Sequence, residues 1–458
     1  MDKNKKVKNS LPPGNIMGTM SLNRLLLSMS IPMMISMMVQ ALYNIVDSIF
    51  VAQINENALT AVSLAFPVQA LMFSVGIGTG VGINAFLSRS LGERNFDSVN
   101  KAATNGLFLV WLSSIAFMGI GFFGAELFFR SQTDSEEIVR YGRDYLSVVC
   151  IFSIAVFSQI TFERLLASTG KTFYAMISQG IGAVANIILD PIMIFGLFGF
   201  PRMEVKGAAI ATIFGQTLAT LIALYFNLTK NHEVKLSFRG FRPDGRVIKS
   251  IYRVGLPSIL MQSIGSVMTY GFNRILISFT ATAAAVFGVY FRLQSFVFMP
   301  VFGLNNAMVP IIAFNYGAKQ KTRIIKTIKL SLMYAVAIMV CGFILFELIP
   351  DKLLMMFNAT AEMLSIGVTA LRIIAIHFLL AGFCIVLISV FQALGDGLES
   401  LVVSFVRQLI VLLPAAWLLS RLGSVDMVWW SFPIAEVAAL IISLILIKRM
   451  YDKKIKML

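Results

Sequence analysis

An aspartate interrupts an apolar run near the middle of the chain, in the segment ANIILDPIMIF (185–195). Asp190 follows Asn186 by four residues, which places both side chains on one face of a helix. A second acid, Asp47, lies in an apolar run near the N-terminus. An acid inside a membrane costs about 2.5–3.5 kcal/mol, so it faces the bundle interior or water and commonly serves transport. Oxygen-bearing side chains in this pattern predict a site for a proton or a small cation.

The composition predicts that these runs lie in a membrane. Of 458 residues, 57% are hydrophobic and 13% are charged, compared with about 45–50% and about 25% in ordinary globular domains. The apolar stretches run for roughly 20 to 30 residues, enough to cross a hydrocarbon core of about 30 Å as helices. We therefore expect an all-α, multi-pass membrane protein.

The polar interruptions define the predicted spans and their orientation. Lys and Arg concentrate in the loops on the side that holds both termini, which predicts cytoplasmic termini in a bacterial inner membrane. The same loop charges explain the net charge of +15, so no nucleic-acid partner is expected. The twelve spans are expected near residues 24–51, 58–87, 102–124, 144–168, 172–196, 207–229, 251–278, 283–315, 330–349, 362–394, 398–420 and 425–447.

An internal repeat predicts two lobes. A shift of 225 residues aligns Pro32 with Pro257 and Gly92 with Gly317, and further matches continue through four spans. Parallel halves of this kind, related by an axis along the membrane normal, are a transporter arrangement with a central cavity. We predict an N-terminal six-helix lobe (1–228), a cytoplasmic linker (229–250) and a C-terminal six-helix lobe (251–458).

The candidate cation site forms one layer by depth. Asp47, Asp190 and Thr212 each lie within roughly 6–9 Å of the outer end of their predicted spans, at 1.5 Å per helical residue. No Lys or Arg falls in the predicted core of the first six spans, so the acids lack a basic partner there. Two close carboxylates in a low dielectric would share a proton, or their oxygens could surround Na⁺. The alternative is that both acids only join helices through hydrogen bonds to Asn, Tyr and Thr.

These residues resemble the multidrug and toxic compound extrusion (MATE) transporters. The likeness rests on Pro32 fifteen residues before Asp47, on NIILDP (186–191), on GAAIAT (207–212) and on the turn SLGERN (90–95). It implies export of bulky, amphipathic, often cationic compounds, driven by inward H⁺ or Na⁺, with no cofactor beyond the coupling ion. It implies a cation-coupling site at Asp47, Asn186, Asp190 and Thr212, and a helix hinge at Pro32. The candidate substrate-cavity residues on the first span are Gln40, Tyr43 and Asn44.

The second half departs from this pattern. The 225-residue shift places Phe272 opposite Asp47 and Ala415 opposite Asp190, so the acids are not duplicated. Instead, Arg407 could pair with Glu436 of the last span, and the arginines leave room for an anionic substrate. His377, in the tenth span, is expected to hydrogen-bond between helices. The other arginines in these spans are Arg274, Arg292 and Arg372.

Two other functions stay open. A flippase for lipid-linked saccharides or another lipid would share the architecture and would be expected to have an arginine-lined cavity. An intramembrane enzyme would need a clustered nucleophile and base or an acidic metal motif, and the sequence offers neither, so we expect a transporter rather than an enzyme. Its expected partners are small-molecule substrates and membrane lipids, and one two-lobed chain should suffice as a monomer.

Overall fold

The computed structural model describes residues 14–357 and 359–458, and the regular elements of these residues are all helices. Within them, nine helices and two bent helix pairs are long and apolar enough to cross a membrane. The one predicted span not among these is the seventh, which corresponds to α10 (Gly245–Ile277), a helix of 33 residues whose charged ends lower its mean hydropathy. The chain is therefore an all-α membrane protein, and each predicted span corresponds to a helix or a helix pair.

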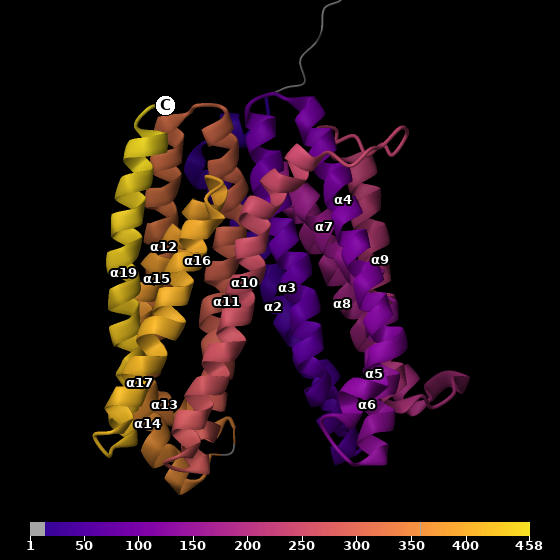
Figure 1. Cartoon of the computed structure of the whole chain (residues 1–458), viewed down its shortest axis with the longest axis vertical. Helices are drawn as coiled ribbons and strands as arrows, with labels where there is room; N and C mark the ends of the chain where they lie inside the picture. The colour runs from indigo at the N-terminus through magenta and orange to yellow at the C-terminus, as the bar shows by residue number, and fades with distance from the viewer. Residues whose placement is uncertain (1–13, 358) are drawn as a thin grey trace, which may run out of the picture.

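The helices of the first half run from residue 16 to residue 229 (Figure 1). They are α1 (Ile16–Thr19), α2 (Leu22–Ala52), α3 (Glu56–Gly92), α4 (Phe96–Gly119), η1 (Ile120–Gly124), α5 (Ala125–Arg130), α6 (Glu136–Ile151), α7 (Ile154–Ser168), α8 (Thr172–Phe195), η2 (Leu197–Gly199) and α9 (Glu204–Thr229).

The second half continues from α10 to the C-terminus. Its remaining elements are α11 (Ala281–Gly317), α12 (Lys321–Leu348), α13 (Pro350–Met355), α14 (Ala361–Ala375), α15 (Phe378–Ala393), α16 (Gly397–Phe405), η3 (Val406–Leu412), α17 (Leu413–Ser420), α18 (Val425–Trp429), α19 (Ser431–Met450) and η4 (Tyr451–Ile455).

Two predicted spans are not straight. The fourth consists of α6 and α7, which meet at an angle of 45°, and the tenth consists of α14 and α15, which meet at 50°. The apolar pattern continues across both breaks, so hydropathy gives no signal for them. The predicted interhelical hydrogen bond of His377 is wrong: its Nδ1 lies 2.5 Å from the carbonyl oxygen of Ile374, at the bend of its own span.

The internal repeat is visible in the helix ends. Both α3 and α11 are 37 residues long, and each begins and ends 225 residues from the other. Their caps repeat as well, because Asn55 accepts a hydrogen bond from the backbone N–H of Ala58, and Thr280 accepts one from Ala283. The bends of spans four and ten occupy corresponding places. The structure is therefore two pseudo-symmetric six-span lobes.

Both described termini lie at one end of the molecule, here called the terminus end (Figure 1). Arg323, at the start of α12, donates to the carbonyl of Met17 in α1, and Lys321 donates to the carbonyl of Lys456 after η4. The segment between α9 and α10 lies over α4 at this end, where the backbone N–H of Lys235 donates to Asn100.

The division at 1–228, 229–250 and 251–458 stays a prediction, and residues 1–13 of its first part lie outside the described residues.

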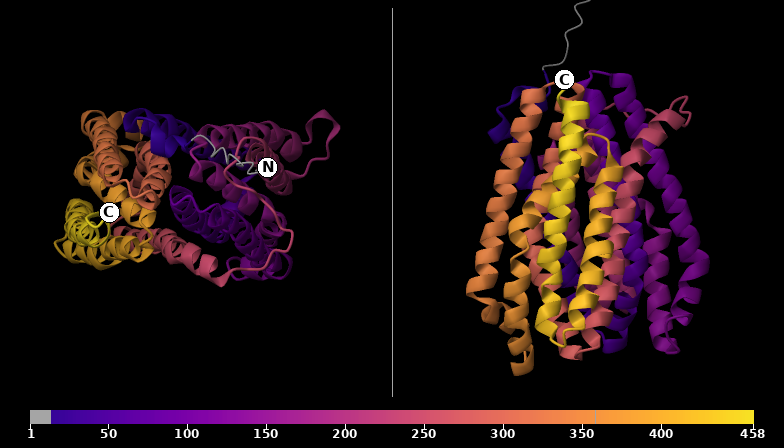
Figure 2. Two further views of the ribbon diagram at one scale, coloured as in Figure 1. Left: turned by 90° about the horizontal axis from the view of Figure 1, so that it is seen from above. Right: turned by 60° about the vertical axis from the view of Figure 1, so that its left-hand side comes forward.

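Along the shared interface, a helix of each lobe packs against a helix of the other lobe as well as against its own lobe. In the first lobe α2 packs against α11 and α8, and in the second lobe α10 packs against α3 and α16. Seen from above, the halves lie side by side, and in the side view they come together toward the terminus end (Figures 1 and 2). The helices that pack across the lobe interface are therefore α2, α3, α10 and α11.

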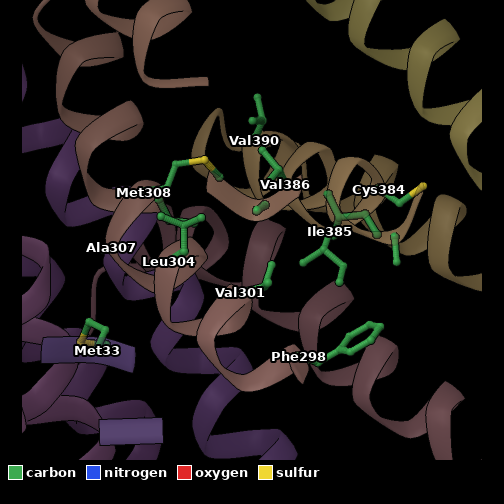
Figure 3. Packing of buried hydrophobic residues seen from close by; sticks show 14 of the residues in the cluster. Met33, Phe298, Val301, Leu304, Ala307, Met308, Cys384, Ile385, Val386 and Val390 are labelled. Atoms are coloured by element: carbon green, nitrogen blue, oxygen red, sulfur yellow. The ribbon is translucent and has the colours of Figure 1, made fainter. Parts of the chain in front are cut away.

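An apolar core holds the second lobe together. Val301, Leu304 and Met308 of α11 face Ile385 and Val386 of α15 in a buried cluster, and Met33 of α2 lies at its edge (Figure 3). Close packing of such side chains fixes the position of α11. This packing matters for function because α11 carries cavity residues on its other faces.

Candidate functional site

The acid of the opening motif lies between α8 and α9. Asp190 is fully buried, and its Oδ1 accepts a hydrogen bond from Asn186 Nδ2 at 3.2 Å. The same amide nitrogen lies 3.4 Å from Thr212 Oγ1 on α9, to which it donates. The helical spacing of 186 and 190 places both side chains toward α9, as expected for residues four apart. One amide thus links the acid to the hydroxyl.

The second acid approaches from α2, which packs against α8. Asp47 lies close enough to Asp190 for the charges of the two carboxyl groups to interact. Tyr145 of α6 accepts a hydrogen bond from Gln69 at 3.1 Å. The structure therefore brings together all four residues that the sequence singled out for cation coupling, Asp47, Asn186, Asp190 and Thr212.

Three oxygen atoms in this cluster are buried without a hydrogen-bond partner among the described residues. They are Asp47 Oδ1, Asn186 Oδ1 and Asp190 Oδ2. Buried polar atoms are nearly always satisfied, so each such atom needs an explanation. A proton between the carboxyls or a sodium ion among the three oxygens would satisfy them. The donor set fits a hard monovalent cation, because all three atoms are oxygens.

A cavity of about 740 Å³ lies beside the acids, between the lobes. Gln40, Tyr43 and Asn44 of α2 line it, as do Asn186 and Thr212 of the acid cluster. Among the described residues, four Met and four Phe side chains line the cavity, together with eight Gln and four Asn side chains. Amide groups both donate and accept hydrogen bonds, so the cavity suits polar, planar compounds as well as apolar ones.

The expectation that the first six spans carry no internal arginine is wrong. Arg164 of α7 lines the cavity and donates from Nη1 to Asn306 of α11 at 2.9 Å, across the lobe interface. Its neighbour Glu163 also lines the cavity and accepts a hydrogen bond from Gln159 at 3.0 Å. The sequence does show these two adjacent charges within the predicted span 144–168. They lie near the predicted end of that span, where charged residues are expected to reach the membrane surface. In the structure, the bend before α7 turns this segment toward the cavity instead.

The second half contains a buried ion pair. Arg407 of η3 lies with Nη1 3.4 Å from Glu436 Oε1 of α19, with side-chain exposures of 21% and 5%, which confirms the predicted pairing. Arg372 lies 3.9 Å from Glu347 at a more exposed position. Arg274 and Arg292 are exposed on the outside of the bundle. The charge that reaches the interior of this half is therefore Arg407, with Glu436 beside it.

Fold and cavity together define a class: a multi-pass membrane transporter of two parallel six-span lobes around a polar central cavity. The MatE family model matches residues 32–192 and again 257–418. The chain therefore belongs to the MATE family of transporters, and it is a transporter rather than an enzyme. The two matches begin 225 residues apart, which agrees with the internal repeat.

Curated relatives and solved structures cover nearly the whole chain. The chain is 26% identical to the multidrug export protein MepA of Staphylococcus haemolyticus over 93% of each chain. It is also 26% identical to the FAD transporter of Shewanella oneidensis, over 91% of this chain and 92% of that protein. The structure of an outward-facing multidrug resistance MATE transporter superposes with a TM-score of 0.90 at 26% identity, covering 97% of this chain and 99% of the other.

Proposed function

We propose that this protein exports bulky amphipathic compounds, cationic ones among them, by antiport against H⁺ or Na⁺. The observation that carries the proposal is a group of three buried oxygens, at Asp47, Asn186 and Asp190, beside an interlobe cavity; none of them has a hydrogen-bond partner in the part of the chain that the structure describes. A site that is complete only when a cation occupies it is suited to energy coupling. The relatives named for multidrug export and for FAD transport support export of organic compounds.

The coupling follows from charge. With both carboxyls uncompensated, the acid layer attracts a cationic substrate into the adjoining cavity. A proton or Na⁺ that binds between Asp47 and Asp190 halves this negative charge and weakens the attraction, and the substrate then leaves. Charges in a low dielectric interact strongly enough for one bound cation to change the affinity for another. The driving ion and the substrate thus compete for the same negative charge.

Alternating access requires the lobes to move relative to each other. In this structure α2 is one continuous helix from Leu22 to Ala52, with Pro32 inside it. A proline lacks the N–H that would bond to the preceding turn, so the helix can bend there at low cost. We infer that Pro32 is the hinge at which α2 bends when the coupling cation binds.

The setting of this cycle is also inferred. We infer that the terminus end lies in the cytoplasm and that the membrane is a bacterial inner membrane, which the excess of Lys and Arg in the loops of that end supports. Coupling ions then enter from the opposite side, nearer to Asp47 and Asp190. Both lobes and the whole cavity belong to one chain, so we infer that a monomer is the transporting unit and that it needs no cofactor besides the coupling ion.

The test is export of a cationic dye from proteoliposomes with an imposed proton or sodium gradient. We expect Asp47→Asn and Asp190→Asn each to lower gradient-driven export by about tenfold or more, because each removes a charge to which the cation binds. The matched control is Asp97→Asn, at an exposed acid that pairs with Lys101 at 2.8 Å and should export as wild type.

The outcomes separate the alternatives. Wild-type export by both acid variants would show that the cluster only joins helices. Absence of gradient-driven export of any cationic dye by the intact protein would instead favour a lipid flippase on the same architecture. The gradient that drives export identifies the coupling ion.

A further inference from the structure

A second cavity, of about 680 Å³, opens beside the first within the same lobe interface. It lies against α3, α10, α11, η3 and α19. The two cavities share part of their walls, so a ligand can reach from one into the other. The shared polar side chains are Gln262, Gln294, Arg407 and Gln408.

Among the described residues, Arg407 is the only charged side chain common to both cavity walls. It lies in η3, a π-helical stretch of seven residues within an otherwise α-helical span. Such insertions widen the helix and are frequent at functional sites. The guanidinium group is thereby held at the junction of the two cavities.

Most of the hydrogen-bonding capacity of Arg407 is unused. A guanidinium carries five N–H donors, and within the described residues Arg407 makes one side-chain hydrogen bond, from Nη1 to Glu436 at 3.4 Å. This distance is long for a charge-assisted bond, which is typically about 2.7–2.9 Å. Glu436 therefore compensates the charge of Arg407 through Nη1 and leaves the Nε and Nη2 donors without a partner among the described residues.

A second donor without a partner lies in the same wall. Tyr290 of α11 is fully buried, lines the second cavity, and its hydroxyl has no hydrogen-bond partner among the described residues. Arg407 and Glu436 line the same cavity. A buried phenol normally finds a partner, so a ligand oxygen would complete both this donor and the guanidinium fork.

We propose that Arg407, assisted by Tyr290, binds the carboxylate of zwitterionic substrates at the junction of the two cavities. The proposal rests on the export function proposed above and extends its substrate class. The cationic part of such a compound faces the acid layer of the first lobe, and its carboxylate binds the arginine of the second lobe. Glu436 is the resident counter-ion, which keeps Arg407 compensated when the site is empty or holds a purely cationic compound.

The test compares two probes that differ in one group: a rhodamine with a free benzoate and its methyl ester. Both share the cationic xanthene, but only the acid offers a carboxylate. In proteoliposomes with an imposed ion gradient, we expect the double variant Arg407→Gln/Glu436→Gln to lower export of the acid relative to the ester by about tenfold or more. The double change removes both charges together and so leaves no unpaired buried ion.

Two further variants make the result specific. Arg292→Gln removes an exposed arginine of the same half and should keep the wild-type ratio of acid to ester export. Glu436→Gln frees Arg407 from its counter-ion and should raise the ratio above that of wild type. The proposal is overturned if the double variant keeps the wild-type ratio, or if it loses both probes equally. Failure of the intact protein to export the ester would instead contradict the export function itself.

Discussion

At the scale of the residue, the acid cluster owes its properties to an incomplete set of hydrogen bonds. Asn186 donates its amide N–H groups to Asp190 and Thr212. Its carbonyl oxygen is buried and has no donor among the described residues. A purely structural amide would be expected to satisfy both of its ends. The local geometry therefore favours a ligand role over simple helix joining.

Thr212 allows a single-hydroxyl test of this arrangement. We expect Thr212→Val to raise several-fold the driving-ion concentration needed for half-maximal export, because it removes the hydroxyl that orients Asn186. A typical hydrogen bond contributes about 0.5–1.5 kcal/mol, equivalent to roughly twofold to tenfold in affinity. The measurement is initial export rate against the imposed ion concentration.

The control is another threonine on the same helix. Thr217 is exposed and its hydroxyl bonds to the carbonyl of Ile213 in its own helix. Thr217→Val should leave the ion dependence unchanged. Equal shifts in the two variants would contradict a specific role for Thr212.

At the scale of the element, glycines bring helices of the two lobes into backbone contact. A Cβ at Gly92 of α3 would lie 1.9 Å from the carbonyl oxygen of Phe314 in α11, and one at Gly317 of α11 would lie 2.1 Å from that of Arg89 in α3. The two contacts are related by the 225-residue repeat. Gly78 against Ile259 and Gly303 against Met34 form a second such pair. Small residues of this kind let membrane helices approach closely. These contacts therefore hold the two lobes together where α3 meets α11 and α10.

A larger side chain at Gly92 should destabilise the conformation in which α3 and α11 are in backbone contact. We expect Gly92→Ala to destabilise it by about 1–3 kcal/mol, the usual range for overpacking, because the obstructing atom is backbone and cannot rotate away. Export should slow, and thiol labelling of a cysteine introduced at the buried position Ala85, on the same face of α3 as Gly92, should become faster as the lobes separate. Gly317→Ala, its repeat counterpart, should act in the same way.

The control glycine lies in the same lobe with free space around it. A Cβ at Gly119 of α4 would meet no atom within 4 Å, so Gly119→Ala should leave export and labelling unchanged. Fast labelling in that variant too would indicate general loosening of the bundle rather than an obstructed interface.

At the scale of the whole molecule, the two lobes have diverged in charge while keeping one backbone plan. The first lobe carries paired acids at Asp47 and Asp190, and the second carries Phe272 and Ala415 at the corresponding positions. Only the second lobe has the Arg407 and Glu436 pair facing the cavities. The shared backbone plan allows the two lobes to move relative to each other. The different charges of the lobes orient an amphipathic compound that binds across their interface.

The charge moved in one cycle should depend on the substrate. If one coupling cation enters for each compound that leaves, export of a monovalent cation moves no net charge, whereas export of a zwitterion moves one positive charge inward. Each charge gains about 2.3 kcal/mol per 100 mV. We expect a potential negative on the cytoplasmic side to accelerate export of the rhodamine acid and not of its ester, measured with potassium and valinomycin. The same response for both probes would contradict this stoichiometry.

The sequence by itself determined the membrane class, the twelve spans, the repeat and the first-lobe acids, because hydropathy and intramembrane charge are local properties with a large free-energy cost. Only the tertiary structure decided the rest. Three features depend on which helix faces meet: the bends before α7 and α15, the inward position of Glu163 and Arg164, and the amide side chains of the cavity wall. The apolar pattern of the sequence does not predict these contacts, because the lipid and the protein core are equally apolar. The junction at Arg407 likewise exists only after α11, η3 and α19 have packed together.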